Sequence, residues 1–179
     1  MITLFLIGFM GCGKSTIAKI LSNDLKLNLV DTNNEIEIEE KSTIQKIIEA
    51  KGDLYLQKKE SELLKKISNR FMVVSLGDGF TKNIEIANRI KSISRIIFLD
   101  ANAKTVMNNL KNNYKEKPYI YNNFDEEYIQ KMIDERKPMY EYMSNASIKV
   151  DNTSIDDVIL QVLNYYNNWN KAEVYLKIC

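Results

Sequence analysis

The sequence predicts an α/β fold in which helices cover both faces of a parallel sheet. Two observations carry this prediction. Short apolar runs rich in Val, Ile and Phe alternate with longer segments whose apolar residues recur with helical period. Most of the apolar runs contain few polar positions, as expected of strands that are buried on both faces. Right-handed crossover connections between such strands give a three-layer sandwich.

Five strands are expected, with helices in the intervals between them. The expected strands are residues 2–7, 27–30, 71–76, 95–99 and 148–150. The expected helices are residues 14–25, 42–50, 53–68, 82–92, 104–112, 126–143 and 154–169. Two helices have start signals, because Thr81 precedes KNIEIANRI and Ser154 precedes IDDVILQVL, which carries acidic residues in its first turn.

Length and composition suit one domain, residues 1–179. Of the 179 residues, 45% are hydrophobic and 27% are charged, which is enough to bury a single sizeable core. Residues 112–125, NNYKEKPYIYNNFD, show neither helical nor strand periodicity. An irregular segment of this length in a compact domain is often a lid, and we expect one here.

Charge and residue usage exclude several classes of function. The 25 Lys and Arg residues nearly balance the 24 Asp and Glu residues, so we expect no partnership with nucleic acid or an anionic membrane. The two cysteines, Cys12 and Cys179, are no disulfide framework and fit a reducing compartment. The absence of histidine excludes His-based triads and His-ligated metals. We expect a cytoplasmic monomer that acts on a small molecule.

The segment GFMGCGKS, residues 8–15, matches the pattern G-x-x-x-x-G-K-[ST] between an expected strand and an expected helix. Backbone N–H groups and the helix N-terminus there favour phosphate oxygens. Lys14 is expected to reach the β- and γ-phosphates of a nucleotide, and Ser15 to bind Mg²⁺. The expected nucleotide-binding residues of this loop are Gly11, Cys12, Gly13, Lys14, Ser15 and Thr16. The motif predicts the P-loop NTPase type of fold; a glycine-rich turn with a solvated lysine is the alternative.

The P-loop alone does not name a reaction, because GTPases, small-molecule kinases and ATPase motors share it. The chain is short, the loop lies near its N-terminus, and no N-K-x-D segment for guanine recognition follows. These features favour a small-molecule kinase that uses ATP.

Six further segments carry a family resemblance. In chain order they are LVDTNNEIE, KGDLYLQKKE, VVSLGDGF, the pair Asn88-Arg89, EKPYI and ERKPMY. With the P-loop, in this order and at similar spacing, they resemble the shikimate kinase family over nearly the entire chain. The resemblance implies a five-stranded parallel sheet of order 2-3-1-4-5, a substrate-binding helical region at about 32–65 and a lid at about 112–125. It also implies transfer of the γ-phosphoryl group of ATP, with Mg²⁺, to a hydroxyl of shikimate in aromatic amino acid biosynthesis.

The resemblance also implies roles for individual residues. Asp31 ends the second strand, where its carboxylate approaches Mg²⁺ together with Ser15, or else caps the following turn. Arg136 clamps the substrate carboxylate or a phosphate, unless it is a solvated helical arginine. Lys117 in the lid stands where the family usually has an arginine over the phosphates, and simple exposure is its alternative. The expected catalytic residues are Lys14, Asp31 and Arg136.

Three positions depart from the family pattern, all among the expected substrate contacts. Asn33 replaces the second Asp of the D-x-D element, which is the usual candidate for the general base. Gln57 replaces the arginine that grips the substrate carboxylate. Asp78 replaces the middle one of three glycines, and we expect it to pair with Arg136. The predicted substrate-binding residues are Asn33, Gln57, Gly77, Asp78, Gly79 and Arg136.

These departures leave three hypotheses open. The first is an ATP-dependent kinase that acts on shikimate through altered contacts. The second keeps the chemistry with another acceptor, a neutral or amino-bearing polyol or cyclic alcohol. The third is a non-catalytic, nucleotide-binding relative. The number of matching motifs favours shikimate, whereas the pocket chemistry favours another acceptor.

Overall fold

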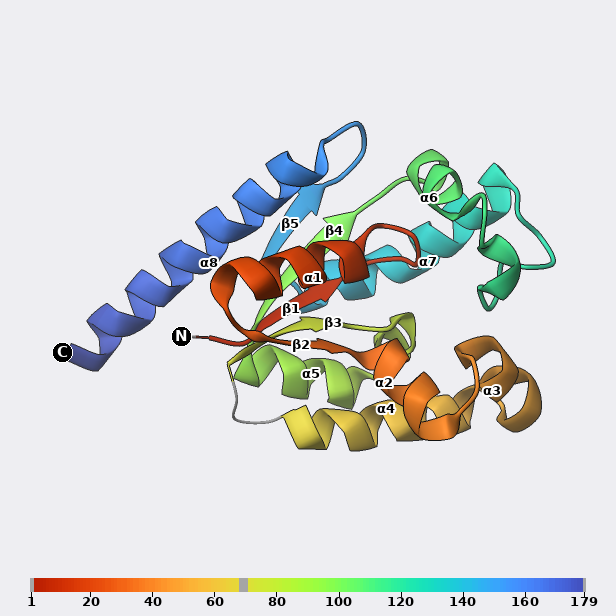
Figure 1. The fold of residues 1–179 in the computed structure, drawn as a ribbon, viewed down its shortest axis with the longest axis horizontal. Coiled ribbons are helices and arrows are strands. Elements are labelled where there is room, and N and C mark those ends of the chain that lie inside the picture. The colour runs from red at the N-terminus through yellow and green to blue at the C-terminus, as the bar shows by residue number, and fades with distance from the viewer. Residues whose placement is uncertain (1, 68–70, 179) are drawn as a thin grey trace.

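A five-stranded parallel sheet of order β2-β3-β1-β4-β5 forms the centre of the molecule in the computed structural model, which describes residues 2–67 and 71–178 (Figure 1). The strands are β1 (Leu4–Ile7), β2 (Asn28–Asp31), β3 (Met72–Ser75), β4 (Arg95–Asp100) and β5 (Ala146–Lys149). All four neighbouring pairs are parallel. The predicted fold class and strand order are confirmed.

Helices lie on both faces of the sheet (Figure 1). The α-helices are α1 (Lys14–Leu25), α2 (Thr32–Glu40), α3 (Ile44–Lys51), α4 (Asp53–Ile67), α5 (Ile84–Ile93), α6 (Ala103–Leu110), α7 (Glu126–Met143) and α8 (Ile155–Ile178). Two 3₁₀ helices are η1 (Asp78–Lys82) and η2 (Tyr114–Glu116). Within the described ranges, no helix has both the length and the apolar character needed to span a membrane.

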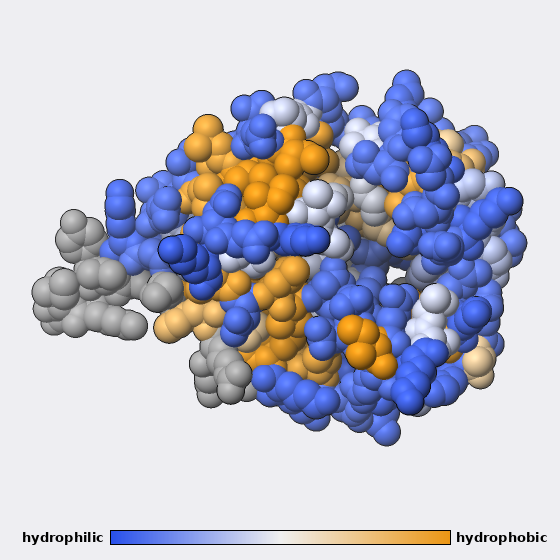
Figure 2. Space-filling model, viewed as in Figure 1, coloured by the Kyte–Doolittle hydropathy of each residue, from blue (hydrophilic) through white to orange (hydrophobic). Residues whose placement is uncertain are grey.

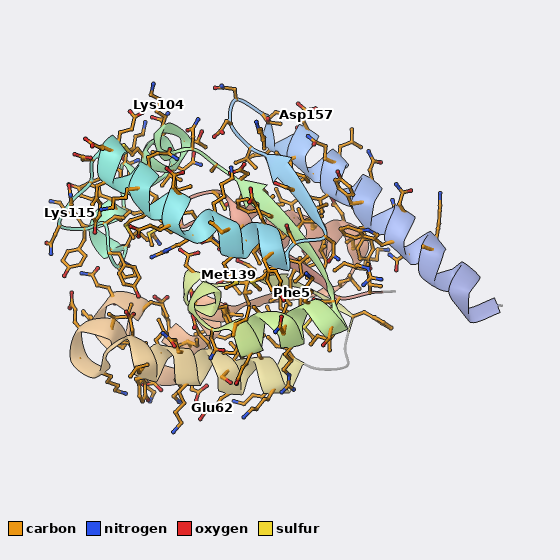
Figure 3. All side chains as sticks on the ribbon, turned by 180° about the vertical axis from the view of Figure 1, so that it is seen from behind. Phe5, Glu62, Lys104, Lys115, Met139 and Asp157 are labelled. Atoms are coloured by element: carbon orange, nitrogen blue, oxygen red, sulfur yellow. The ribbon has the colours of Figure 1, made fainter. Side chains whose placement is uncertain are left out.

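Alternation along β1 divides the core into two layers. Leu4 and Leu6 pack in the cluster that α1 and α8 cover, whereas Phe5 and Ile7 pack in the cluster that α4, α5 and the end of α7 cover. Seen from the other side, Met139 of α7 lies over the face to which Phe5 belongs (Figure 3). Because successive strand residues point to opposite faces, one wholly apolar strand serves both layers.

Some predicted boundaries are wrong. Periodicity predicted no separate helix between residues 31 and 42, yet Asp31 accepts a hydrogen bond from Asn34 N and caps helix α2 there, within the helical region of about 32–65 that the resemblance implied. Asn83, not Thr81, caps α5. β5 begins before the expected 148–150 segment, and α8 extends to Ile178 rather than ending at 169. The predicted last residue of α4, Ser68, lies outside the described residues.

A satellite cluster joins α2, α3 and α4 beside the sheet. Its apolar centre consists of Ile36, Ile44, Ile47 and Leu56. Ion pairs fasten its outside: Lys59 Nζ lies 2.7 Å from Glu39 Oε1 and 2.8 Å from Glu40 Oε1, and Lys51 Nζ lies 2.6 Å from Glu40 Oε2. This cluster forms one wall of the cavity described below.

We expect Glu40→Gln to destabilise this cluster at neutral pH but not in strong acid. Hydrogen bonds from Lys51, Lys59 and Tyr55 lower the pKa of Glu40 from 4.5 to about 2. A lowered folded-state pKa contributes stability above the unfolded-state value, and that contribution is lost as the pH falls through the folded value. Thermal melts of Glu40→Gln and the unaltered chain should therefore converge between pH 4.5 and pH 2. A difference in melting temperature that is constant over this range would contradict the assignment.

Candidate active site

A cavity of about 1130 Å³ opens at the carboxyl ends of the strands. Open α/β sheets bind ligands at this edge. The P-loop part of the wall consists of Met10, Gly11, Cys12, Gly13, Lys14, Ser15 and Thr16. The acceptor end of the wall is formed by the residues that follow β2 and β3, by the start of α4 and by the predicted lid. Figure 2 shows the surface hollowed beside the α2–α3 region.

The P-loop begins helix α1 directly from a turn. Gly13 caps the helix with φ 99°, a left-handed conformation that L side chains rarely adopt. Lys14 folds back into the loop, where its Nζ donates to Gly8 O at 2.5 Å and to Phe9 O at 3.0 Å. Cys12 is buried, which raises the pKa of its thiol, and its backbone N–H donates to Phe9 O at 3.2 Å within the turn. The segment therefore has the backbone shape that a phosphate cradle requires.

Lys14 and Asp78 form an ion pair inside the cavity. Lys14 Nζ lies 3.1 Å from Asp78 Oδ1, and the two side chains are 10% and 12% exposed. Burial alone would lower the pKa of Lys14, but the charge and hydrogen bond of Asp78 outweigh it, so the pKa is raised. The lysine is therefore a fixed cation at neutral pH.

Arg136 approaches the same carboxylate from α7. Its Nη1 lies 3.7 Å from Asp78 Oδ2, and its guanidinium lies between the rings of Phe9 and Tyr119, 5.1 and 5.3 Å from their centroids. The side chain is 12% exposed. Within the described part of the chain, buried Nη1 has no hydrogen-bond acceptor. The expected pairing of Asp78 with Arg136 is present, although Arg136 itself is not among the described residues of the cavity wall.

Ser15 and Asp31 form an oxygen-bearing pair on the P-loop side. Ser15 Oγ donates to Asp31 Oδ2 at 2.5 Å, while Asp31 Oδ1 also caps α2. Both roles considered for Asp31 at the sequence level are thus compatible. A hydroxyl and a carboxylate side by side next to a phosphate cradle are the hard donors that Mg²⁺ takes in nucleotide sites, so these residues fit that ion.

The ends of β2 and β3 are joined by a buried hydroxyl. Thr32 Oγ1 accepts a hydrogen bond from Gly77 N at 2.8 Å. Asn33 packs directly on Gly77: a Cβ at this glycine would lie 2.1 Å from Asn33 Oδ1. Only glycine fits position 77 without displacing Asn33. The two loops thus place Asn33 and Asp78 at one end of the cavity.

The segment predicted to be a lid contacts the substrate-side helices. The Tyr119 hydroxyl donates to Asp53 Oδ1 at the start of α4. Burial and this carboxylate raise the pKa of Tyr119. Lys117 and Pro118 line the cavity next to it. The segment therefore covers the end of the cavity that lies between Arg136 and α4.

Helix α4 presents Leu56 and Glu60 to the cavity. The Glu60 carboxylate packs against Gly79, where a Cβ would lie 2.5 Å from both carboxylate oxygens. Gln57 is half-buried on the same helix but is not among the described residues of the cavity wall. Its role in binding the acceptor stays a prediction.

Comparisons with known proteins agree with this geometry. A family model described as shikimate kinase matches residues 10–167. The chain is 32% identical to the shikimate kinase of Sulfurihydrogenibium sp. (strain YO3AOP1) over 89% of this chain and 95% of that protein. It is 36% identical to the shikimate kinase of Aquifex aeolicus (strain VF5) over 82% of this chain and 84% of that protein. The chain belongs to the shikimate kinase family.

Solved structures of family members share the fold. The shikimate kinase of Acinetobacter baumannii in complex with shikimate superposes with a TM-score of 0.87 at 21% identity, over 94% of each chain. The shikimate kinase of Aquifex aeolicus gives a TM-score of 0.75 at 27% identity, over 93% of this chain and 96% of that one. Membership in this family makes the chain an ATP-dependent kinase that uses ATP and Mg²⁺.

Three residues that position the site of this family member were missed by sequence reasoning. Thr32 carries the hydrogen bond that ties β2 to Gly77. Asn109 Nδ2 donates to Gly11 O at 2.8 Å and fastens the P-loop to α6. Tyr119 connects the predicted lid to Asp53. Each acts through a contact between segments far apart in the chain, which no local sequence pattern indicates.

Proposed function

We propose that this chain transfers the γ-phosphoryl group of ATP to a hydroxyl of shikimate. The observation that carries the proposal is the convergence of two largely buried cations, Lys14 and Arg136, on the carboxylate of Asp78, which lines the cavity beside the P-loop. Phosphoryl transfer relies mainly on positioning and on neutralising charge at the transferring group, and this point supplies both. A relative of the same fold is described in complex with shikimate, which supports that acceptor.

The P-loop side is proposed to hold the nucleotide. Lys14 carries donors toward the cavity and, on nucleotide binding, exchanges loop carbonyls for phosphate oxygens. Lys117 of the lid adds a second positive charge on this wall. Arg136, which lies beside Asp78 of the cavity wall, stabilises the charge of the transferring group with its guanidinium.

Ser15 and Asp31 are proposed to hold Mg²⁺. When bound, the ion neutralises charge on the phosphate oxygens and orients them. Asp31 also caps α2, so the carboxylate is fixed by the backbone of the helix that begins the acceptor region. Asp31 therefore fixes the position of the proposed Mg²⁺ site relative to the helix that begins the acceptor region.

A different acceptor is the alternative that one observation favours. Asp78 and Glu60 place two carboxylates on the acceptor end of the cavity, where an anionic substrate carboxylate would be repelled. A neutral or amino-bearing cyclic alcohol would meet no such repulsion.

We further propose that the chain works as a monomer and that it works in the cytoplasm. Its cysteine usage supports the cytoplasmic location.

The acceptor is tested by following product rather than ATP loss. The purified chain is incubated with Mg-ATP and either shikimate, quinate or a neutral cyclitol, and phosphorylated product is measured by mass spectrometry against ADP. One shikimate phosphate per ADP is expected. Stoichiometric phosphorylation of a neutral cyclitol, without shikimate phosphate, would replace the acceptor and retain the kinase.

A further inference from the structure

We infer that Asp78 is the catalytic carboxylate that holds the acceptor hydroxyl and takes its proton. The inference rests on the proposed function, since it assigns a role in the same transfer. Its starting observation is that the residues after β3, and not position 33 after β2, carry a carboxylate. The end of β2 offers the amide of Asn33, whose oxygen accepts a hydrogen bond but not a proton at neutral pH. The neighbouring strand end offers a carboxylate instead.

The strand register explains why Asp78 stands in for a side chain at position 33. Asp31 of β2 pairs with Ser75 of β3, so the residues that follow both strands leave the sheet side by side. Asn33 lies against Gly77, the residue before Asp78. A carboxylate at position 78 therefore belongs to the same end of the cavity as one at position 33 would.

The contacts of Asp78 place it at the reacting group rather than at a remote wall. One carboxylate oxygen lies 3.1 Å from Lys14 Nζ and the other lies 3.7 Å from Arg136 Nη1. These are the two cations proposed to flank the γ-phosphoryl group. A carboxylate held between these two cations lies next to the group proposed to be transferred, which is where a base for the attacking hydroxyl has to be.

Other carboxylates on the cavity wall have different engagements. Asp31 accepts from Ser15 and from the backbone of α2. Glu37 accepts from Ile44 N at the start of α3. Glu60 packs against Gly79, on the α4 side of the cavity. Asp78 is the one among these four that contacts both cations.

The proposed step balances as follows. A lone pair of the acceptor oxygen forms the new bond to the γ-phosphorus, and the bond from that phosphorus to the β–γ bridging oxygen breaks. The electron pair of the broken bond stays on ADP. The hydroxyl proton passes to the Asp78 carboxylate, which then releases it to water. The products are a phosphate monoester, ADP and a proton.

Asp78→Asn tests the step because it keeps the shape of the side chain and removes the proton acceptor. Loss of a positioned base lowers turnover by about 10²- to 10⁴-fold, and we expect kcat for shikimate to fall by about 10²-fold or more. The matched control is Asp24→Asn, at an exposed position on α1, which should leave kcat unchanged. Thermal melts of both variants verify folding.

A relocation experiment separates catalysis from a merely structural role. Asp78→Gly should lower kcat as Asp78→Asn does. The double variant Asn33→Asp/Asp78→Gly should have a kcat at least tenfold higher than that of Asp78→Gly alone. Equal or higher kcat in Asp78→Asn would overturn the inference and leave the proposed function standing, because Asp78 would then only compete with phosphate for Lys14 and Arg136. No recovery in the double variant would also count against the inference.

The acceptor-free reaction distinguishes the two failures. Without shikimate, water takes the place of the acceptor, and slow ADP release reports the same step. If shikimate does not raise ADP release by the unaltered chain, the proposed acceptor is wrong, and the acceptor-free rate then tests the inference. A fall of tenfold or more in the acceptor-free rate of Asp78→Asn supports the inference, and an unchanged rate overturns it. A chain that releases no ADP under either condition would overturn both.

Discussion

Lys14→Met is expected to abolish stabilisation by nucleotide and to lower phosphoryl transfer by about 10³-fold, the loss that follows removal of a charge-stabilising group in this chemistry. The Lys14 ammonium lies inside the P-loop and donates hydrogen bonds to Gly8 O and Phe9 O. On nucleotide binding, phosphate oxygens would accept these hydrogen bonds instead. A ligand that binds only the folded state raises its melting temperature. The measurement is the thermal shift with Mg-ATP, followed by ADP release.

Lys58→Met is the matched control for this variant. Lys58 is exposed on α4 and is not among the described cavity residues, so its loss should change neither the nucleotide shift nor the rate. An Mg-ATP shift that survives in Lys14→Met would contradict the assignment of residues 8–15 as the phosphate cradle. The melting temperature of the variant without nucleotide reports separately on the lost ion pair with Asp78.

Arg136→Met is expected to lower kcat by about 10²- to 10³-fold, as removal of one preorganised donor does in other enzymes. The guanidinium is held between two aromatic rings, and its Nη1 is buried without a hydrogen-bond acceptor in the described chain. Unlike Lys14→Met, this variant should retain the thermal shift with Mg-ATP, since Lys14 and the glycines of the P-loop are kept. Steady-state kinetics with both substrates measure the loss of kcat, and the thermal shift measures whether Mg-ATP still binds.

Arg89→Met serves as the control, because Arg89 is exposed on α5, whereas the Arg136 side chain is 12% exposed beside Asp78. Arg136→Lys adds a finer test: a lysine keeps the charge but not the planar fork, so most of the loss should remain. Turnover that is unchanged in both Arg136 variants would show that Arg136 serves the packing of Phe9 and Tyr119 rather than the transfer.

Local patterns were enough to predict the sheet and the phosphate cradle. Buried strands are continuous apolar runs, and a glycine-rich turn before a helix is a contiguous motif, so neither needs knowledge of distant contacts. Periodicity did not delimit α2, which lies within the helical region of about 32–65 that the family resemblance implied; of Ile36 and Ile38, only Ile36 is buried. The capping of α2 by Asp31 decides the conformation, and that signal was interpreted mainly as a metal ligand.

The acceptor end was harder to predict, because its geometry comes from contacts across the chain. Asp78 was expected beside Arg136, and it lies there, but its ion pair with Lys14 joins residues 64 positions apart and was not foreseen. The bond from Tyr119 to Asp53 spans 66 positions. No residue pattern encodes such distances, and they emerge only when the lid, α4 and the strand ends are assembled.

The most direct test of the account is ADP release by the purified chain with Mg-ATP, measured with and without millimolar shikimate. The account predicts that shikimate raises the rate above the acceptor-free rate and that the increase saturates. Binding of Mg-ATP with no increase at any shikimate concentration would contradict the proposed acceptor, and the search would turn to neutral cyclic alcohols.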